Sequence, residues 1–194
     1  MKGNGAIACL GWGSLIWDPG TLPRLGPWLW DGPTLPLEFT RESGAKKGGR
    51  GNRITLVITP GSAPIRSLWI ELDTRSLNQA REVLARREGI PTSNHHAIGH
   101  VDCTTGERLG EGCDAVAEWA RERDLTGVVW TNLSPKFNGE QRTPSVEEVC
   151  SFLNQLDANS RQVAEAYVRL APRQIDTAYR SAMERDLGWG PVIK

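Results

Sequence analysis

The position of Glu88 in the sequence suits a general acid/base catalyst. Residues 74–88 have helical periodicity, and Glu88 is the last of them before Gly89. The step from Leu77 to Glu88 turns a helix through about 1100°, which returns it to within about 20° of the same face. Leu84 lies on that face too, so we expect Glu88 to be turned towards the core. Burial and the helix dipole then both disfavour the charged carboxylate, and general acid/base catalysts share this property.

Two other interpretations of Glu88 are open from the sequence. The residue ends a helix, and its side chain would point into solvent if the helix frayed there. The neighbouring Arg86 and Arg87 would alternatively neutralise the carboxylate. A second feature, a glycine-rich turn, favours the buried interpretation.

This turn follows the first apolar segment. Residues 5–10 have the sequence GAIACL, which predicts a buried strand. The turn lies in the string LGWGSLIWDP, which begins at Leu10, the last residue of that segment. Backbone N–H groups of such a turn, here at Gly11, Trp12, Gly13, Ser14 and Leu15, would converge on an anion such as a carboxylate. The turn lacks the Gly-Lys-Ser/Thr of a P-loop and the third glycine of a dinucleotide-binding motif. The Ser14 hydroxyl would either bind the substrate or cap the turn.

Basic residues flank and fill the segment 41–53. Its sequence, RESGAKKGGRGNR, predicts a mobile glycine-rich loop over the site, with Lys46, Lys47 and Arg50 inside it. Arg41 and Arg53 stand at its two ends, where they would either bind an anionic substrate or be solvated ends of strands. No aromatic residues alternate with these cations, so a nucleic-acid surface is not expected.

No metal or cofactor is expected. On a strand, His96 and His100 would share one face and His95 would lie on the other. The chain contains no Cys-x-x-Cys or His-Glu-x-x-His motif. Its four cysteines are scattered without a close pair, which favours reduced thiols in a cytoplasmic protein.

Charge and hydropathy argue against several classes of protein. Lys plus Arg and Asp plus Glu both number 23, so no net charge attracts nucleic acid or an anionic membrane surface. No apolar run reaches the roughly 18 residues that a membrane span needs, and the N-terminal stretch is too short and glycine-rich for a signal peptide. We expect a cytoplasmic protein that acts on a small molecule, and the oligomeric state is not predicted.

The remaining elements predict an α+β fold. Strands are expected at 34–41, 53–59, 66–72, 96–103 and 127–132, and helices at 74–88 and 113–123. Asp73 and Thr74 would cap the first helix, and Gly89 would end it. The stretch 18–36 predicts a loop with at most one helical turn. Helical patterning from Ser145 to Leu187, broken near 157–159 and 171–172, predicts a single domain over 1–194 with residues 144–187 packed on it as an extension.

Together these motifs resemble a known family. The string GWGSLIWDP is similar to the substrate loop of γ-glutamylcyclotransferases, and most similar to that of their glutathione-specific ChaC branch. The string LARREG resembles the stretch that carries the family's catalytic glutamate, which places that role on Glu88. The strings RITLVI and SLWIEL are similar to the family's middle strands in order and spacing. The resemblance covers roughly residues 6–102.

The resemblance implies both a fold and a reaction. The fold would be a small mixed β-barrel flanked by helices. The loop amides would hold the amino-acid head of a γ-glutamyl substrate while its own α-amine attacks its γ-carbonyl, giving 5-oxoproline and a free amine. Glu88 would take a proton from the ammonium group and return one to the leaving nitrogen. Because the nucleophile is tethered, positioning would supply much of the rate, and no metal or cofactor is needed.

The chain also departs from the family. Trp12 stands where a tyrosine is usual, the residues after Glu88 lack a tyrosine often found there, and residues 110–194 match no pattern that assigns them a role. The leaving group is therefore open, with glutathione as one candidate substrate. A non-catalytic binding or regulatory protein on the same fold is an alternative, and so is amide hydrolysis or acyl transfer in the same cleft.

Overall fold

The computed structural model describes residues 5–44, 52–91 and 93–192. The predicted α+β class and the helical C-terminal part are confirmed. Within the described residues the strands form a six-stranded sheet and a three-stranded sheet rather than a closed barrel. Lys46, Lys47 and Arg50 of the predicted mobile loop lie outside these residues. No helix in the described part of the chain is long and apolar enough to cross a membrane.

The chain forms two compact units, each assembled from three stretches of sequence. Unit 1 takes the described residues of Met1–Gly11, Asp18–Leu35 and Arg66–Leu133, and unit 2 takes those of Trp12–Trp17, Pro36–Ile65 and Ser134–Lys194. Organisation as a single domain, with 144–187 as an extension packed on it, stays a prediction.

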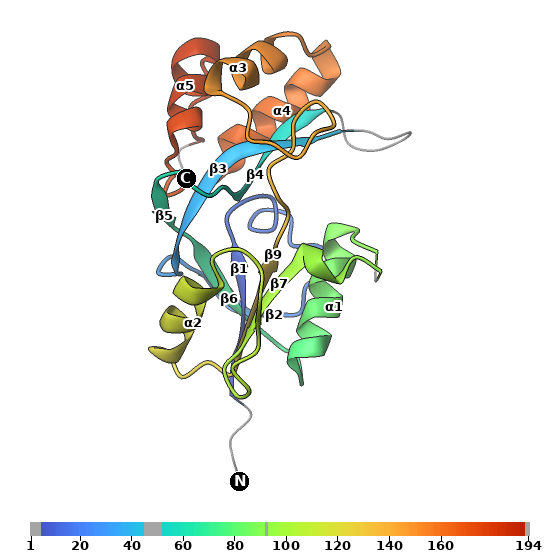
Figure 1. Ribbon diagram of the computed structural model, residues 1–194. Helices are drawn as coiled ribbons and strands as arrows, with labels where there is room; N and C mark the ends of the chain where they lie inside the picture. The colour runs from blue at the N-terminus through green and yellow to red at the C-terminus, as the bar shows by residue number, and fades with distance from the viewer. Residues whose placement is uncertain (1–4, 45–51, 92, 193–194) are drawn as a thin grey trace. The chain divides into compact units, whose positions relative to one another are not determined.

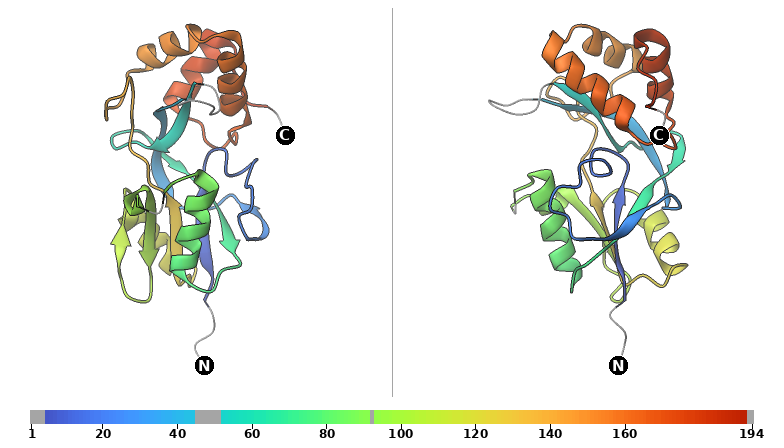
Figure 2. Two further views of the ribbon diagram at one scale, coloured as in Figure 1. Left: turned by 90° about the vertical axis from the view of Figure 1, so that its right-hand side faces the viewer. Right: turned by 180° about the vertical axis from the view of Figure 1, so that it is seen from behind.

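The six-stranded sheet is the framework of unit 1. Its strand order is β2 (Arg24–Leu29), β6 (Leu68–Leu72), β1 (Ile7–Gly11), β9 (Gly127–Thr131), β7 (Ile98–Asp102) and β8 (Arg108–Leu109). Strand β1 pairs antiparallel with β6 and parallel with β9. All five residues of β1 are buried, because it lies inside the sheet with a helix packed near it. Helices α1 (Leu77–Glu88) and α2 (Cys113–Arg121) lie on either side of this sheet (Figures 1 and 2).

Three local predictions in unit 1 were wrong. Strand β2 occupies part of the stretch expected as a loop, because pairing with β6 at the sheet edge overrides its glycine and proline content. Helix α1 is capped by Ser76, whose side chain accepts a hydrogen bond from the Gln79 N–H, rather than by Asp73 or Thr74. His95–Ala97 form a 3-10 helix ahead of β7 instead of the first residues of the strand.

The three-stranded sheet and the last three helices belong largely to unit 2. Strand β3 (Thr34–Ser43, of which Pro36 onwards is in unit 2) lies between β4 (Arg53–Ile58) and β5 (Pro64–Arg66). Helix α4 (Ala158–Leu170) packs on β4, and α3 (Val146–Asn154) packs on α5 (Ala178–Leu187). The predicted helix breaks near 157–159 and 171–172 are confirmed, since Asp157 caps α4 and Ala171 ends it.

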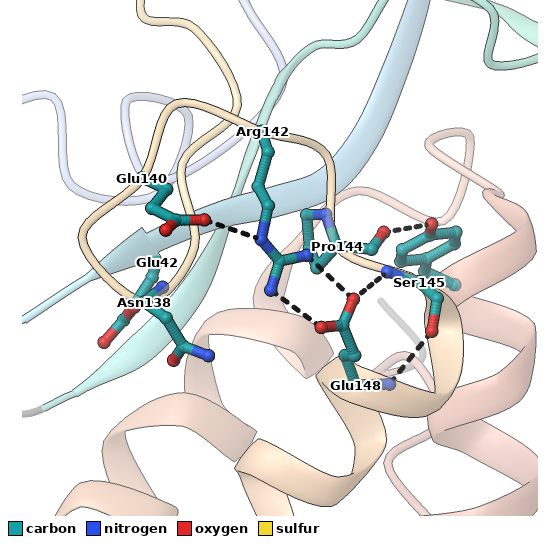
Figure 3. Close-up of polar contacts among 8 residues, drawn as sticks. Glu42, Asn138, Glu140, Arg142, Pro144, Ser145 and Glu148 are labelled. Carbon is teal, nitrogen blue, oxygen red and sulfur yellow. Dashed lines mark hydrogen bonds and ion pairs between the residues drawn. The ribbon is translucent and has the colours of Figure 1, made fainter.

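Charged side chains fix the ends of these helices. At the start of α3, Ser145 and Glu148 form a capping box, and Arg142 donates to both oxygens of Glu148 at 2.9 and 2.7 Å (Figure 3). These hydrogen bonds lower the pKa of Glu148 to about 2. Glu38, 3% exposed, accepts a hydrogen bond from the N–H of Tyr179 at the start of α5. Burial raises the pKa of Glu38.

Arg180 closes the junction between α4 and α5. Its side chain is buried, with 2% of the residue exposed. The guanidinium donates to four carbonyl oxygens at 2.7 to 3.2 Å, which belong to Pro172, Ile175, Val168 and Ala171. The last carbonyls of a helix lack intrahelical partners, so Arg180 satisfies acceptors that α4 leaves open.

Candidate functional site

Glu88 is the last residue of α1, and its helix end is well defined. Gly89 takes the left-handed conformation with φ of 67°, as predicted for a residue that ends a helix, and N–H groups beyond the helix close onto Ala85 and Arg86. The Glu88 side chain is 19% exposed. It is therefore half-buried and does not extend into bulk solvent from a frayed end, while the expected alternative, an ion pair with a neighbouring arginine, is present.

An arginine on the same helix holds the carboxylate. Arg87, whose side chain is 7% exposed, donates from Nη1 to Oε1 of Glu88 at 2.6 Å. Its Nε donates to the carbonyl oxygen of Asp18 at 3.1 Å, and Nη2 contacts the same oxygen. The second carboxylate oxygen of Glu88, Oε2, accepts no hydrogen bond from the described residues and is not fully buried. One carboxylate oxygen is thus held by Arg87, and the other accepts no hydrogen bond from the described residues.

The charge of Glu88 acts on the central strand β1. Cys9 of β1 is fully buried, and this burial raises the pKa of its thiol. The negative charge of Glu88 raises the pKa of Cys9 further, while Arg87 acts in the opposite direction. Cys9 is therefore held as a thiol, which makes it a poor nucleophile.

The predicted substrate turn divides between the two units. Gly11 ends β1 in unit 1, whereas Trp12, Gly13, Ser14 and Leu15 belong to unit 2. The turn is closed by a hydrogen bond from the N–H of Ile16 to the carbonyl oxygen of Gly13 at 3.0 Å.

Two backbone N–H groups of this turn have no hydrogen-bond acceptor among the described residues. Gly13 and Leu15 are buried, and their N–H groups have no acceptor among the described residues. Backbone N–H groups of a turn that have no acceptor of their own suit an anionic ligand.

Tyr167 of helix α4 organises the turn within unit 2. Its hydroxyl accepts a hydrogen bond from the N–H of Leu56 at 3.3 Å, and the indole of Trp12 donates to the carbonyl oxygen of the same residue at 3.3 Å. The Trp17 ring meets the Tyr167 ring edge-on, with 5.4 Å between centroids. A Cβ atom on Gly13 would lie 2.5 Å from the Tyr167 hydroxyl, so only glycine fits there without a shift.

The two predicted arginines have different surroundings. Arg53, on β4, places its guanidinium 5.4 Å from the centroid of the Tyr167 ring, which brings it into the same cluster as the turn. Arg41, on β3, donates to the carbonyl oxygen of Ser134 at 2.6 Å. Burial lowers the pKa of Arg41. The structure therefore gathers Trp12, Gly13 and Arg53 around Tyr167, and it directs Arg41 towards Ser134.

The histidines do not form a metal centre. His95 and His96 lie exposed in the 3-10 helix, while His100 is buried in β7 and lies 3.3 Å from Glu107. The described residues contain no group of three or more His, Cys, Asp or Glu side chains that could hold a metal ion.

Sequence reasoning missed the part played by Tyr167. The residue lies in the C-terminal part of the chain, which the motifs did not cover, and 8% of it is exposed. The only signal is the apolar stripe of α4, in which Ala164, Tyr167 and Val168 are buried. This stripe indicates a packed helix face but does not say what it packs against.

Comparison with known proteins gives two similar solved structures. One is a crystal structure of a glutathione-specific γ-glutamylcyclotransferase from yeast, with 14% identity over 95% of this chain and 98% of that chain, and a TM-score of 0.49. The other is a crystal structure of a selenomethionine-labelled glutathione-specific γ-glutamylcyclotransferase from yeast, with 15% identity over 98% of this chain and 90% of that chain, and a TM-score of 0.46. No family model matches the chain, and no curated protein sequence matches it.

Proposed function

We propose that the chain is a γ-glutamylcyclotransferase-like enzyme that converts a γ-glutamyl amine or peptide into 5-oxoproline and a free amine. One observation carries the proposal, which is the state of the Glu88 carboxylate. The side chain is 19% exposed, Arg87 holds one of its oxygens at 2.6 Å, and its other oxygen is open. A catalytic carboxylate needs this combination of fixed orientation and one reachable oxygen.

The proposed reaction is an intramolecular substitution at the γ-carbonyl. Glu88 removes a proton from the α-ammonium group of the substrate, and the freed amine attacks the γ-carbonyl carbon. A C–N bond forms to close the five-membered ring, and Glu88 returns the proton to the leaving nitrogen as the C–N bond to that nitrogen breaks. The ring nitrogen then loses its second proton, through Glu88, to the released amine, which departs as an ammonium ion. Atoms and protons balance without another reactant, so the protein supplies positioning and one acid/base group.

The turn at Gly11, Trp12, Gly13, Ser14 and Leu15 is proposed to bind the amino-acid head of the substrate. The unpaired N–H groups of Gly13 and Leu15 support this role, since they are suited to a carboxylate. Arg53 and Arg41 are proposed to add positive charge for the same anion. Trp12 has no hydroxyl, but Tyr167 of α4 places its phenol hydroxyl beside Gly13.

The second candidate is a binding or regulatory protein without catalytic activity. Trp12 favours it, because its indole donates to the Leu56 carbonyl in a buried position and is therefore used in packing. A cytoplasmic location, the absence of a cofactor and a γ-glutamyl substrate with an open leaving group stay predictions under either candidate.

The decisive experiment measures 5-oxoproline released from a panel of γ-glutamyl amines and peptides that includes glutathione. We expect turnover by the wild-type chain, and we expect Glu88→Gln to lower kcat by about 10²- to 10⁴-fold, the usual contribution of a general acid/base. Glu118→Gln is the matched control, since Glu118 is an exposed glutamate on α2. Its activity should equal that of the wild type.

Two outcomes would reject the proposal. Saturable binding of a γ-glutamyl compound without release of 5-oxoproline from any panel member would favour the binding protein. Release of free glutamate instead of 5-oxoproline would indicate amide hydrolysis. Circular dichroism of Glu88→Gln should match that of the wild type, so that a loss of activity reports on chemistry and not on folding.

A further inference from the structure

A pocket in unit 1 is lined by residues of α1 and of the segment that follows this helix. Its volume is about 320 Å³. Asn78, Arg81 and Glu82 line it from α1, and Asn94, His95 and Ile98 line it from the segment that follows the helix. Glu88 is not among its lining residues. The volume is at the low end of the range of about 300–1,000 Å³ for small-molecule sites, which suits a ligand no larger than an amino acid or a dipeptide.

The polar side chains of this pocket lack partners among the residues that the structure describes. Arg81 has a buried Nε atom without a hydrogen-bond acceptor, although α1 offers nearby glutamates. The side chains of Glu82, Asn94 and His95 also make no hydrogen bond or ion pair within the described residues. Arg81 and Glu82 thus line the pocket without an ion pair to each other or to another described residue, which leaves both charges to a ligand.

The side chains of Arg81 and Glu82 lie at different depths in this pocket. Ile98 is 3% exposed and forms an apolar floor, and Arg81 is half-buried near it with its Nε out of contact with solvent. Glu82, by contrast, is exposed at the rim. A guanidinium binds carboxylates through paired N–H donors, and a carboxylate binds ammonium groups. A positive group inside and a negative group outside therefore match a molecule that carries both charges.

We propose that this pocket binds a small zwitterion, an amino acid or a short peptide, with its carboxylate at Arg81 and its ammonium group at Glu82. The amides of Asn78 and Asn94 and the imidazole of His95 complete the polar wall. The site is separate from the proposed reaction at Glu88, and it does not depend on that reaction. A multiply charged anion such as phosphate fits less well, because Glu82 would repel it.

The test follows binding to the full ¹⁵N-labelled chain by NMR, with glycylglycine as the zwitterion, acetate as the carboxylate alone and ethylammonium as the cation alone. We expect glycylglycine to shift the side-chain amide signals of Asn78 and Asn94 in a saturable way and to bind more tightly than either half. Arg81→Gln should weaken this binding about tenfold or more, as expected for the loss of a charge-assisted contact. Glu82→Gln should weaken binding of glycylglycine but not of acetate.

Arg75→Gln is the matched control, because Arg75 is an exposed arginine just before α1 that does not line the pocket. It should bind glycylglycine as the wild type does. Three results would overturn the proposal: no saturable shift of the two amides, unchanged affinity in Arg81→Gln, or tighter binding of inorganic phosphate than of glycylglycine. Arg81→Lys, which keeps the charge, guards against misfolding of the glutamine variant. Repeating the titration with Glu88→Gln separates the two sites, since we expect this variant to bind glycylglycine at the pocket even if the γ-glutamyl chemistry proves wrong.

Discussion

Replacing Gly13 by alanine tests how the turn is held. The added Cβ would lie 2.5 Å from the Tyr167 hydroxyl oxygen but 3.4 Å from the ring carbon that bears it. Nonbonded heavy atoms attract best at about 3.5–4.0 Å, so the hydroxyl contact is repulsive and the ring contact is close to tolerable. Gly13 does not have a positive φ, so alanine brings no backbone strain at this position. The cost of Gly13→Ala is therefore steric, and it arises from one oxygen atom.

The magnitude follows from that geometry. Overpacking of a buried site costs about 1–3 kcal/mol, so we expect Gly13→Ala to lower the free energy of unfolding by an amount in this range. Tyr167→Phe removes the acceptor of the Leu56 N–H and should cost about 1 kcal/mol. In the double variant the hydroxyl is gone and the alanine has room. We expect the double variant to be more stable than the sum of the single effects predicts, by about 1 kcal/mol or more.

The assay is urea unfolding followed by tryptophan fluorescence, because the Trp17 ring contacts Tyr167 directly. Tyr179→Phe provides the control, since Tyr179 is the other tyrosine of the chain and also makes a hydrogen bond, to the Pro144 carbonyl at 2.7 Å. Its cost should add to that of Gly13→Ala without coupling. If the Gly13 and Tyr167 effects proved equally additive, the proposed steric contact would be refuted.

Three further predictions concern buried groups. Arg180→Met leaves four carbonyl oxygens without their donor, so it should lower the free energy of unfolding by about 3–5 kcal/mol, measured by urea titration. An effect under about 1 kcal/mol would mean that water replaces the guanidinium. Glu38 has its pKa raised above 4.5 in the folded state by burial, so its contribution to stability is present below pH 4.5 and is lost as the pH rises through the raised value. Urea unfolding at several pH values should therefore show Glu38→Gln gaining stability relative to the wild type across that window, and a constant difference would contradict this. Cys9, which is buried and has a raised pKa, should resist iodoacetamide in the native protein while the exposed Cys103 reacts. Mass spectrometry of the labelled peptides measures the order of labelling, and labelling of Cys9 before Cys103 would contradict this prediction.

The sequence predicted the parts of the site that depend on local periodicity. The helical phase from Leu77 to Glu88 predicted an inward-facing glutamate, and the structure has its side chain half-buried. Gly89 ends the helix because glycine adopts a positive φ without strain. The first strand and the turn after it were also placed correctly, since a buried strand followed by glycines is a local pattern.

Long-range contacts could not be predicted in the same way. The contact of Arg87 with its neighbour Glu88 was one of the alternatives open from the sequence, but its other partner, Asp18, is 69 residues away in the chain. Tyr167 accepts its hydrogen bond from Leu56 across 111 residues. Strand β2 was missed because its pairing with β6, and not its own composition, makes it a strand. In each case the partner is chosen by the tertiary fold.

The interleaving of the two units bears on how the protein is made. The sheet of unit 1 places β9 beside β1, although more than a hundred residues separate them, so this sheet cannot close until Leu133 has left the ribosome. The turn at Trp12–Trp17, made among the first residues, must wait still longer for α4 to supply its tyrosine. Contacts between such distant stretches slow folding. No single cut in the chain would release either unit intact, and a nascent chain stalled before α4 would carry an unfinished turn at Trp12–Trp17.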